Sequence, residues 1–200
     1  MSNPRARRIE LIAVGASAGG VAAIRKLLTY LHPEFHIPIL VVQHMPPTAR
    51  LDVGLIYGGG TGARVVEVED KMKLEPGIVY MACPGYHILV ERDRTVALSV
   101  DDPVMYSRPS IDVFFMSVAR SLKSRAIGIL LTGANGDGAE GLQLIHESGG
   151  VTIVQDPEEA ESPFMPRAAL NRFEPSFVLE LGSIADLLNS FVHSQTELSL

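Results

Sequence analysis

The sequence is poor in the features that mark several protein classes. It has one cysteine in 200 residues, Cys83, which excludes an internal disulfide and fits a reducing compartment, so we expect a cytoplasmic protein. Because no CxxC pair or His/Cys spacing surrounds Cys83, we interpret it as a packed thiol. There is also no HExxH motif and no pair of carboxylates with metal-ligand spacing, so we expect no metal and no cofactor.

Long apolar runs and excess positive charge are missing as well. No run approaches 18 apolar residues and no apolar stretch typical of a signal peptide follows the N-terminus, so direct membrane insertion is not expected. The formal net charge is -6, which gives nucleic-acid binding no support. Basic residues cluster only at Arg5, Arg7 and Arg8, which we interpret as part of a solvated arm.

What the sequence does contain is a regular alternation of apolar strands and helical patterns. Helical spacing of apolar residues follows the first strand, and Ser110 is a plausible N-cap of a later helix. Fully apolar strands between amphipathic helices are typical of an α/β fold with a doubly wound, mostly parallel sheet and helices on both faces. The predicted strands are 9–14, 37–42, 126–131, 151–154 and 177–181, and the predicted helices include one that stops at 149–150 and a closing one at 185–191.

The middle of the chain has a different pattern, with short and closely spaced strand-like segments at 64–68, 78–82, 88–91 and 96–100. Residues 92–94 are typical of a hairpin turn, so we expect a small antiparallel insertion at one edge of the main sheet. The glycine-rich stretch 58–62 predicts a flexible loop rather than a phosphate cradle, because no Gly-Lys-Ser/Thr follows it. The predicted organisation is an N-terminal arm (1–8), one domain (9–193) and a C-terminal tail (194–200).

The first candidate functional residue is Ser17, in the small-residue stretch Gly-Ala-Ser-Ala-Gly-Gly between the first strand and the first helix. A serine at such a turn lifts its hydroxyl above the sheet, near unpaired N–H groups of the helix N-terminus that stabilise negative charge. By itself the motif is equally compatible with a phosphate-binding loop or with a merely tight strand-to-helix connection.

His44 and Asp137 follow two other predicted parallel strands, so all three side chains should meet at the rim formed by the carboxyl ends of the strands. A serine needs a base to take its proton, and an imidazole needs a carboxylate to fix its tautomer. The order Ser, His, Asp differs from that of α/β-hydrolases. Taken alone, His44 could cap a strand end, and Asp137 could be a helix N-cap.

Taken together, the segments 12–20, 42–46, 108–115 and 131–141 resemble the catalytic domain of the chemotaxis protein-glutamate methylesterases, the CheB family. The stretch 149–156, running on to 165–167, is similar too. The resemblance implies hydrolysis of glutamyl methyl esters on methylated chemoreceptors or a related signalling protein, and in some members deamidation of receptor glutamines. It also implies that Ser17 is the nucleophile, His44 the general base and then acid, and Asp137 the orienting carboxylate. Backbone N–H groups at Ala18 and Ala134 are the oxyanion-hole candidates.

The sequence departs from the family at Ala18, where threonine is common, at Ala134, where methionine is common, and across 48–62. It also starts close to the first catalytic strand, so we expect a stand-alone catalytic domain with any regulatory partner acting in trans. Two alternatives stay open. One is a signalling module of the same fold with little or no activity, which the two alanines favour. The other is a nucleotide-binding, flavodoxin-like domain, which rests on the glycine-rich turn alone.

Overall fold

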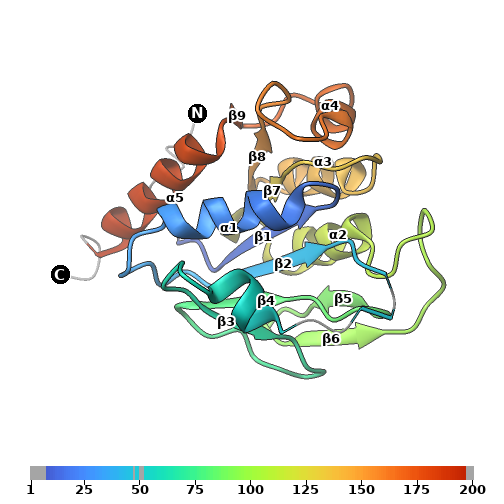
Figure 1. Cartoon of the computed structure of the whole chain (residues 1–200), viewed down its shortest axis with the longest axis horizontal. Coiled ribbons are helices and arrows are strands. Elements are labelled where there is room, and N and C mark those ends of the chain that lie inside the picture. Colours follow the sequence, from blue (N-terminus) through green and yellow to red (C-terminus); the bar gives the residue numbers. More distant parts are fainter. Residues whose placement is uncertain (1–7, 47, 50–51, 197–200) are drawn as a thin grey trace.

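Within residues 8–46, 48–49 and 52–196, which the computed structural model describes, seven parallel strands form a central sheet (Figure 1). This confirms the predicted fold class. In spatial order the strands are β3 (Arg64–Glu67), β4 (Ile78–Met81), β2 (Ile39–Gln43), β1 (Leu11–Ala16), β7 (Ala126–Leu130), β8 (Val151–Gln155) and β9 (Phe177–Leu179).

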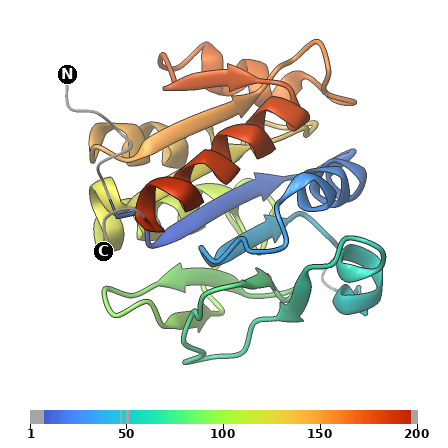
Figure 2. The ribbon, with the colours of Figure 1, turned by 90° about the vertical axis from the view of Figure 1, so that its left-hand side faces the viewer.

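Helices cover both faces of this sheet. One face carries α1 (Gly20–Tyr30), the short π-helix η2 (Gly54–Gly58) and α5 (Leu181–Thr196), which crosses in front of the sheet in Figure 2. The other face carries α2 (Ile111–Leu122), α3 (Ala139–Glu147), α4 (Phe164–Leu170) and a two-stranded antiparallel sheet of β5 (His87–Val90) and β6 (Val96–Ser99). The 3-10 turn η3 (Lys123–Arg125) joins α2 to β7.

Strand β1 shows why the sequence forms this arrangement. All six of its residues are buried. Leu11 and Ala13 pack into the core beneath α2 and α3, whereas Ile12 and Val14 pack into the core beneath α1 and α5. Side chains alternate between the two faces of a strand, so a continuous apolar run is stable only where both faces are covered.

The middle of the chain corrects one expectation. Segments 64–68 and 78–82 are not part of an antiparallel insertion, because β3 and β4 pair in parallel with the main sheet, and only β5 and β6 form a hairpin. The connection between β3 and β4 is an irregular segment with two turns instead of a helix. It hydrogen-bonds to the hairpin through the N–H groups of Lys71 and Leu74, which donate to the carbonyls of Val96 and Arg94. Short strands that follow one another closely, with no helical pattern between them, are typical of antiparallel strands, which is why the sequence favoured an antiparallel insertion here.

Several other element boundaries differ from the predictions. Helix α5 begins at Leu181, inside the predicted last strand, and η2 and α4 were not anticipated. Ser110 is the N-cap of α2, as predicted, and accepts a hydrogen bond from the Val113 N–H. The Cys83 thiol is buried, and burial raises its pKa. Residues 1–7 of the predicted arm, 197–200 of the tail and 50–51 of the divergent segment lie outside the described residues.

The topology has one switch point, between β1 and β7. The chain leaves β1 through α1 on one face of the sheet and leaves β7 through α3 on the other face. The loops after these two strands therefore separate at the carboxyl edge, and ligands of open α/β sheets bind in such a crevice. Ser17 and Asp137 lie in these two loops.

Candidate active site

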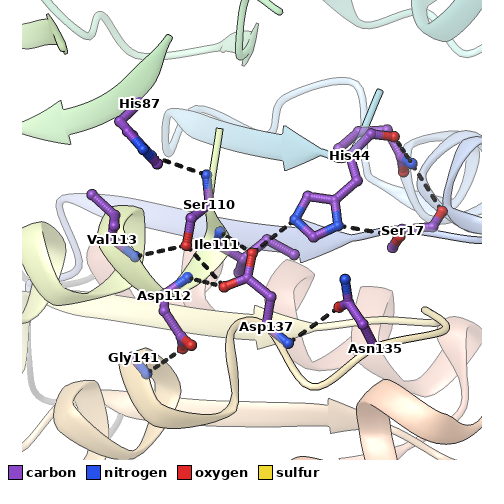
Figure 3. Close-up of polar contacts among 11 residues, drawn as sticks. Ser17, His44, His87, Ser110, Ile111, Asp112, Val113, Asn135, Asp137 and Gly141 are labelled. Atoms are coloured by element: carbon purple, nitrogen blue, oxygen red, sulfur yellow. Dashed lines mark hydrogen bonds and ion pairs between the residues drawn. The ribbon is translucent and has the colours of Figure 1, made fainter. Parts of the chain in front are cut away.

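The structure brings Ser17, His44 and Asp137 together (Figure 3). His44 Nδ1 lies 3.2 Å from Ser17 Oγ, and His44 Nε2 lies 2.8 Å from Asp137 Oδ2. A carboxylate only accepts hydrogen bonds, so Nε2 carries the proton in the neutral imidazole and Nδ1 is left to accept from the serine hydroxyl. The three groups therefore form a continuous hydrogen-bonded series across three loops.

The carboxylate end of this series is completely buried. The Asp137 side chain is 0% exposed, and it accepts three further hydrogen bonds, from Ser110 Oγ (2.9 Å), the Ile111 N–H (2.7 Å) and the Asp112 N–H (2.9 Å). Burial alone would raise the pKa of Asp137, but the hydrogen bonds from His44 and from the two amides outweigh it, so the pKa lies below its ordinary value. The carboxylate is thus held ionised beside the imidazole.

Asp137 and His44 make contacts beyond the ends of their own helix and strand. Asp137 does not cap its own helix, since the N-cap of α3 is Gly138, which has a φ of 98° and makes no side-chain cap bond. It accepts instead from the first turn of α2. His44 does not only end a strand, because its ring lies between Ser17 and Asp137.

Gln43 fixes the relation between the serine and histidine loops. Its side chain is 4% exposed, and Nε2 donates to the carbonyls of both Ser17 (2.8 Å) and His44 (3.0 Å). Gly20 allows this arrangement, because a Cβ at that position would lie 2.0 Å from the amide oxygen of Gln43. Sequence reasoning missed Gln43; a polar residue ending an otherwise apolar strand was the available signal.

Thr132 connects the serine loop to the loop after β7. Its carbonyl accepts from the Ser17 N–H (3.0 Å), and its hydroxyl donates to the Ala18 carbonyl (2.9 Å). The Thr132 N–H donates to Gln155 Oε1 (2.9 Å) at the end of β8. The loops after β1 and β7 and the end of β8 are therefore bound to one another through a single buried residue, which the sequence analysis did not single out.

A second histidine lies behind the site. His87 is 1% exposed, and its Nδ1 accepts from the Ser110 N–H (3.2 Å), so the neutral ring donates from Nε2 to the Asp102 carbonyl (3.1 Å). Figure 3 shows His87 on the far side of Ser110 from Asp137. It holds the start of α2 and makes no contact with the three-residue series itself.

The two oxyanion-hole candidates lie beside the serine loop and in the loop after β7, and both are exposed. Among the residues with described positions, neither the Ala18 N–H nor the Ala134 N–H makes a hydrogen bond. Ala18 directly follows Ser17, and Ala134 follows the Thr132–Gly133 pair that is bonded to the serine loop. Both N–H groups are thus free to donate to a ligand.

A surface hollow of about 550 Å³ adjoins the serine. It is lined by Ser17, Gly19, Gly20, Val21, Ala22, Arg25 and Glu161.

In the part of the chain that the structure describes, no group of three or more His, Cys, Asp or Glu side chains is arranged to hold a metal ion. The same residues contain no helix that is both long and apolar enough to cross a membrane.

Residues 12–188 match the sequence profile of the family described as CheB methylesterase. The chain belongs to this family. Its fold is similar to that of the Thermotoga maritima CheB methylesterase catalytic domain, with a TM-score of 0.85 and 28% sequence identity over 90% of this chain and 97% of that one. The family resemblance and the enzyme class expected from the sequence are confirmed.

Related full-length sequences carry names for two activities. The protein-glutamate methylesterase/protein-glutamine glutaminase of Clostridium acetobutylicum is 32% identical over 89% of this chain and 52% of its own length. A similarly named protein of Pseudomonas syringae pv. syringae is 39% identical over 84% of this chain and 51% of its own. This chain therefore spans about half the length of these two relatives. A relative from Leptospira interrogans, provisionally named for the same activities, is 42% identical over 89% of this chain and 92% of its own length.

Proposed function

We propose that this protein is a serine hydrolase that removes methyl groups from glutamyl side-chain esters of methylated chemoreceptors or a related signalling protein. Deamidation of receptor glutamines is the second reaction we assign to the same site. The observation that carries the proposal is the position of His44, whose two ring nitrogens contact Ser17 Oγ and Asp137 Oδ2. Family membership and the names of the relatives support the choice of substrate.

In the proposed reaction, Ser17 Oγ attacks the ester carbonyl while His44 Nδ1 takes the hydroxyl proton. The tetrahedral intermediate breaks its bond to the methoxy group, which leaves as methanol with the proton from His44. Water then attacks the glutamyl-serine ester, again with His44 as base, and the products are a glutamate side chain and free Ser17. Asp137 stays ionised throughout and stabilises the imidazolium.

The negative oxygen of the intermediate needs donors that are already in place. We assign this role to the N–H groups of Ala18 and Ala134, two exposed residues whose N–H groups are unpaired among the described residues. A backbone N–H donates whatever side chain it carries, so the alanines at these positions are compatible with catalysis. One such donor lowers the activation barrier by roughly 3–4 kcal/mol.

The direct test is the substitution Ser17→Ala, with methanol release from a methylated receptor as the readout. We expect loss of release without unfolding, because Ser17 holds the loop through its backbone, which the substitution leaves intact. The matched control is Ser183→Ala, since Ser183 is exposed on α5 and is not among the residues that line the hollow. Unchanged methanol release by Ser17→Ala would refute the assignment.

A fluorophosphonate label separates this proposal from a signalling module that keeps the fold without activity. Such a label reacts with an activated serine and stays attached to it. An adduct on Ser17 that disappears in His44→Gln supports hydrolysis. An unlabelled Ser17 in the folded wild-type protein favours the module.

A further inference from the structure

Glu161 places a carboxylate at the edge of the hollow that contains Ser17. We propose that Glu161 is a specificity residue that makes the site favour an uncharged side chain over a carboxylate, and so speeds release of the glutamate product. This inference rests on the proposed function, because only an ester or amide hydrolysis turns a neutral side chain into an anion beside Ser17.

The carboxylate lies directly against the loop that carries the nucleophile. A Cβ built on Gly19 would lie 2.8 Å from Glu161 Cβ and 3.0 Å from Glu161 Oε2. Gly19 has a φ of 76° and is the residue from which α1 starts. Glu161 is therefore packed beside the backbone two residues after Ser17, where Gly19 leaves room for it.

The backbone around Glu161 is held in this place. The Ser162 N–H donates to Thr132 Oγ1 (2.8 Å), and the Ser162 carbonyl accepts from the Gly133 N–H (3.0 Å). The same Thr132 hydroxyl donates to the Ala18 carbonyl. The segment that presents Glu161 is thus bonded to the serine loop through one threonine, so its distance from the nucleophile is set by the fold.

The Glu161 carboxylate also lacks a cationic partner among the described residues. In the described part of the chain it has no ion pair, whereas its neighbours Glu159 and Glu158 pair with Lys26 (2.9 Å) and Arg167 (3.1 Å). Arg25 is the other charged residue of the hollow. It lies five residues into α1, about 7.5 Å along the helix from its start, and donates to the Gly59 carbonyl. Its guanidinium thus contacts the backbone at the end of η2 and forms no ion pair with Glu161 among the described residues.

The helix N-terminus and Glu161 act in opposite directions on the anionic product. The first turn of α1 and the unpaired N–H groups attract any anion that forms at Ser17, and this attraction would retain the product. The Glu161 carboxylate, beside Gly19 in the same hollow, repels that anion but has little effect on a neutral ester or amide. For a water-exposed pair of like charges about 5 Å apart, we expect about a three- to fivefold discrimination.

The test compares two fluorophosphonates of equal length, one neutral and one ending in a carboxylate, as labels for Ser17. The measured quantity is the ratio of their second-order labelling rate constants, anionic over neutral. We expect Glu161→Gln to raise this ratio about three- to fivefold at low ionic strength, with a smaller rise in about 0.5 M salt. Glu158→Gln is the matched control, because it removes the same charge from the same segment outside the hollow, and it should leave the ratio unchanged.

The outcomes distinguish this inference from the proposed function. Normal labelling of Ser17 with an unchanged ratio in Glu161→Gln overturns the inference alone, and so does an equal rise in Glu158→Gln. Absence of labelling in the wild-type protein overturns the proposed function and this inference with it. In turnover, Glu161→Gln should also strengthen inhibition by the demethylated receptor about three- to fivefold.

Discussion

Asp137, just before α3, accepts a backbone hydrogen bond from the first turn of α2, and Asp112, in α2, accepts one from the first turn of α3. The Asp112 N–H in α2 donates to Asp137 Oδ1 (2.9 Å), and the Gly141 N–H in α3 donates to Asp112 Oδ1 (2.7 Å). The exchange satisfies N–H groups that helix starts leave unpaired and packs the two helix N-termini against each other. It also places two carboxylates close together in the protein interior.

Asp112→Asn is expected to change how stability depends on pH. Burial raises the pKa of Asp112 to about 6, and the nearby Asp137 adds to the rise. A carboxyl with a pKa raised on folding favours the folded state fully below its unfolded pKa of about 3.9, and loses this contribution as the pH rises through about 6. The free energy of unfolding of the wild type, relative to Asp112→Asn, should therefore fall by up to about 3 kcal/mol between about pH 4 and pH 7. Chemical denaturation at both pH values measures it, and a constant or rising difference contradicts the assignment.

Asp137→Asn should lower both activity and stability. The amide NH2 that replaces one carboxylate oxygen cannot accept a hydrogen bond. In place of Oδ2 it leaves His44 and the Ile111 N–H without an acceptor, and in place of Oδ1 it leaves Ser110 and the Asp112 N–H without one. We expect kcat to fall roughly 10³- to 10⁴-fold, as expected when the imidazole loses its orienting carboxylate, and the free energy of unfolding to fall by about 1–3 kcal/mol. Steady-state kinetics and thermal denaturation test the two effects. Asp186→Asn, at an exposed position of α5, is the control and should change neither.

Thr132→Val should disturb the serine loop while keeping the side-chain volume. Valine has no hydroxyl, so the Ser162 N–H and the Ala18 carbonyl lose their partner at a position that is 1% exposed. We expect a stability loss of about 1–3 kcal/mol and a larger fall in kcat than in substrate affinity. Thr132→Ser retains the hydroxyl and should preserve most of both quantities. Equal kinetic effects of the two variants would show that the hydroxyl does not position the loop.

Gly20→Ala tests the packing between the first turn of α1 and Gln43. The new methyl group would lie 2.0 Å from the Gln43 amide oxygen and 2.8 Å from Ala16 Cβ, and Gln43 cannot move without breaking its bonds to the Ser17 and His44 carbonyls. We expect a loss of about 1–3 kcal/mol and a fall in kcat. Gly182→Ala in α5 is the control, because nothing lies within 4 Å of the added Cβ. Wild-type stability and kcat in Gly20→Ala would show that Gln43 is free to rearrange.

The sequence was sufficient to predict five strands of the parallel sheet and the residues at its rim, but not the parallel pairing of β3 and β4. Strands such as β1 are apolar on both faces, which is stable only between two helical layers, and this pattern is readable from consecutive residues. Because every parallel strand ends at the same edge of the sheet, the residues after β1, β2 and β7 were predicted to meet there. Chain direction puts the three residues at one edge of the sheet, and the neighbouring positions of β2, β1 and β7 in the strand order bring them together.

Only the tertiary structure decided how that rim is held together. Gln43 and Thr132 act through carbonyls and N–H groups of loops far from them in the chain, so nothing in their local sequence indicates their partners. Glu161 is placed beside Gly19 by the crossover that follows β8, across more than 140 residues. Local patterns determine which segments form strands and helices, whereas contacts between loops depend on how the finished sheet brings their ends together.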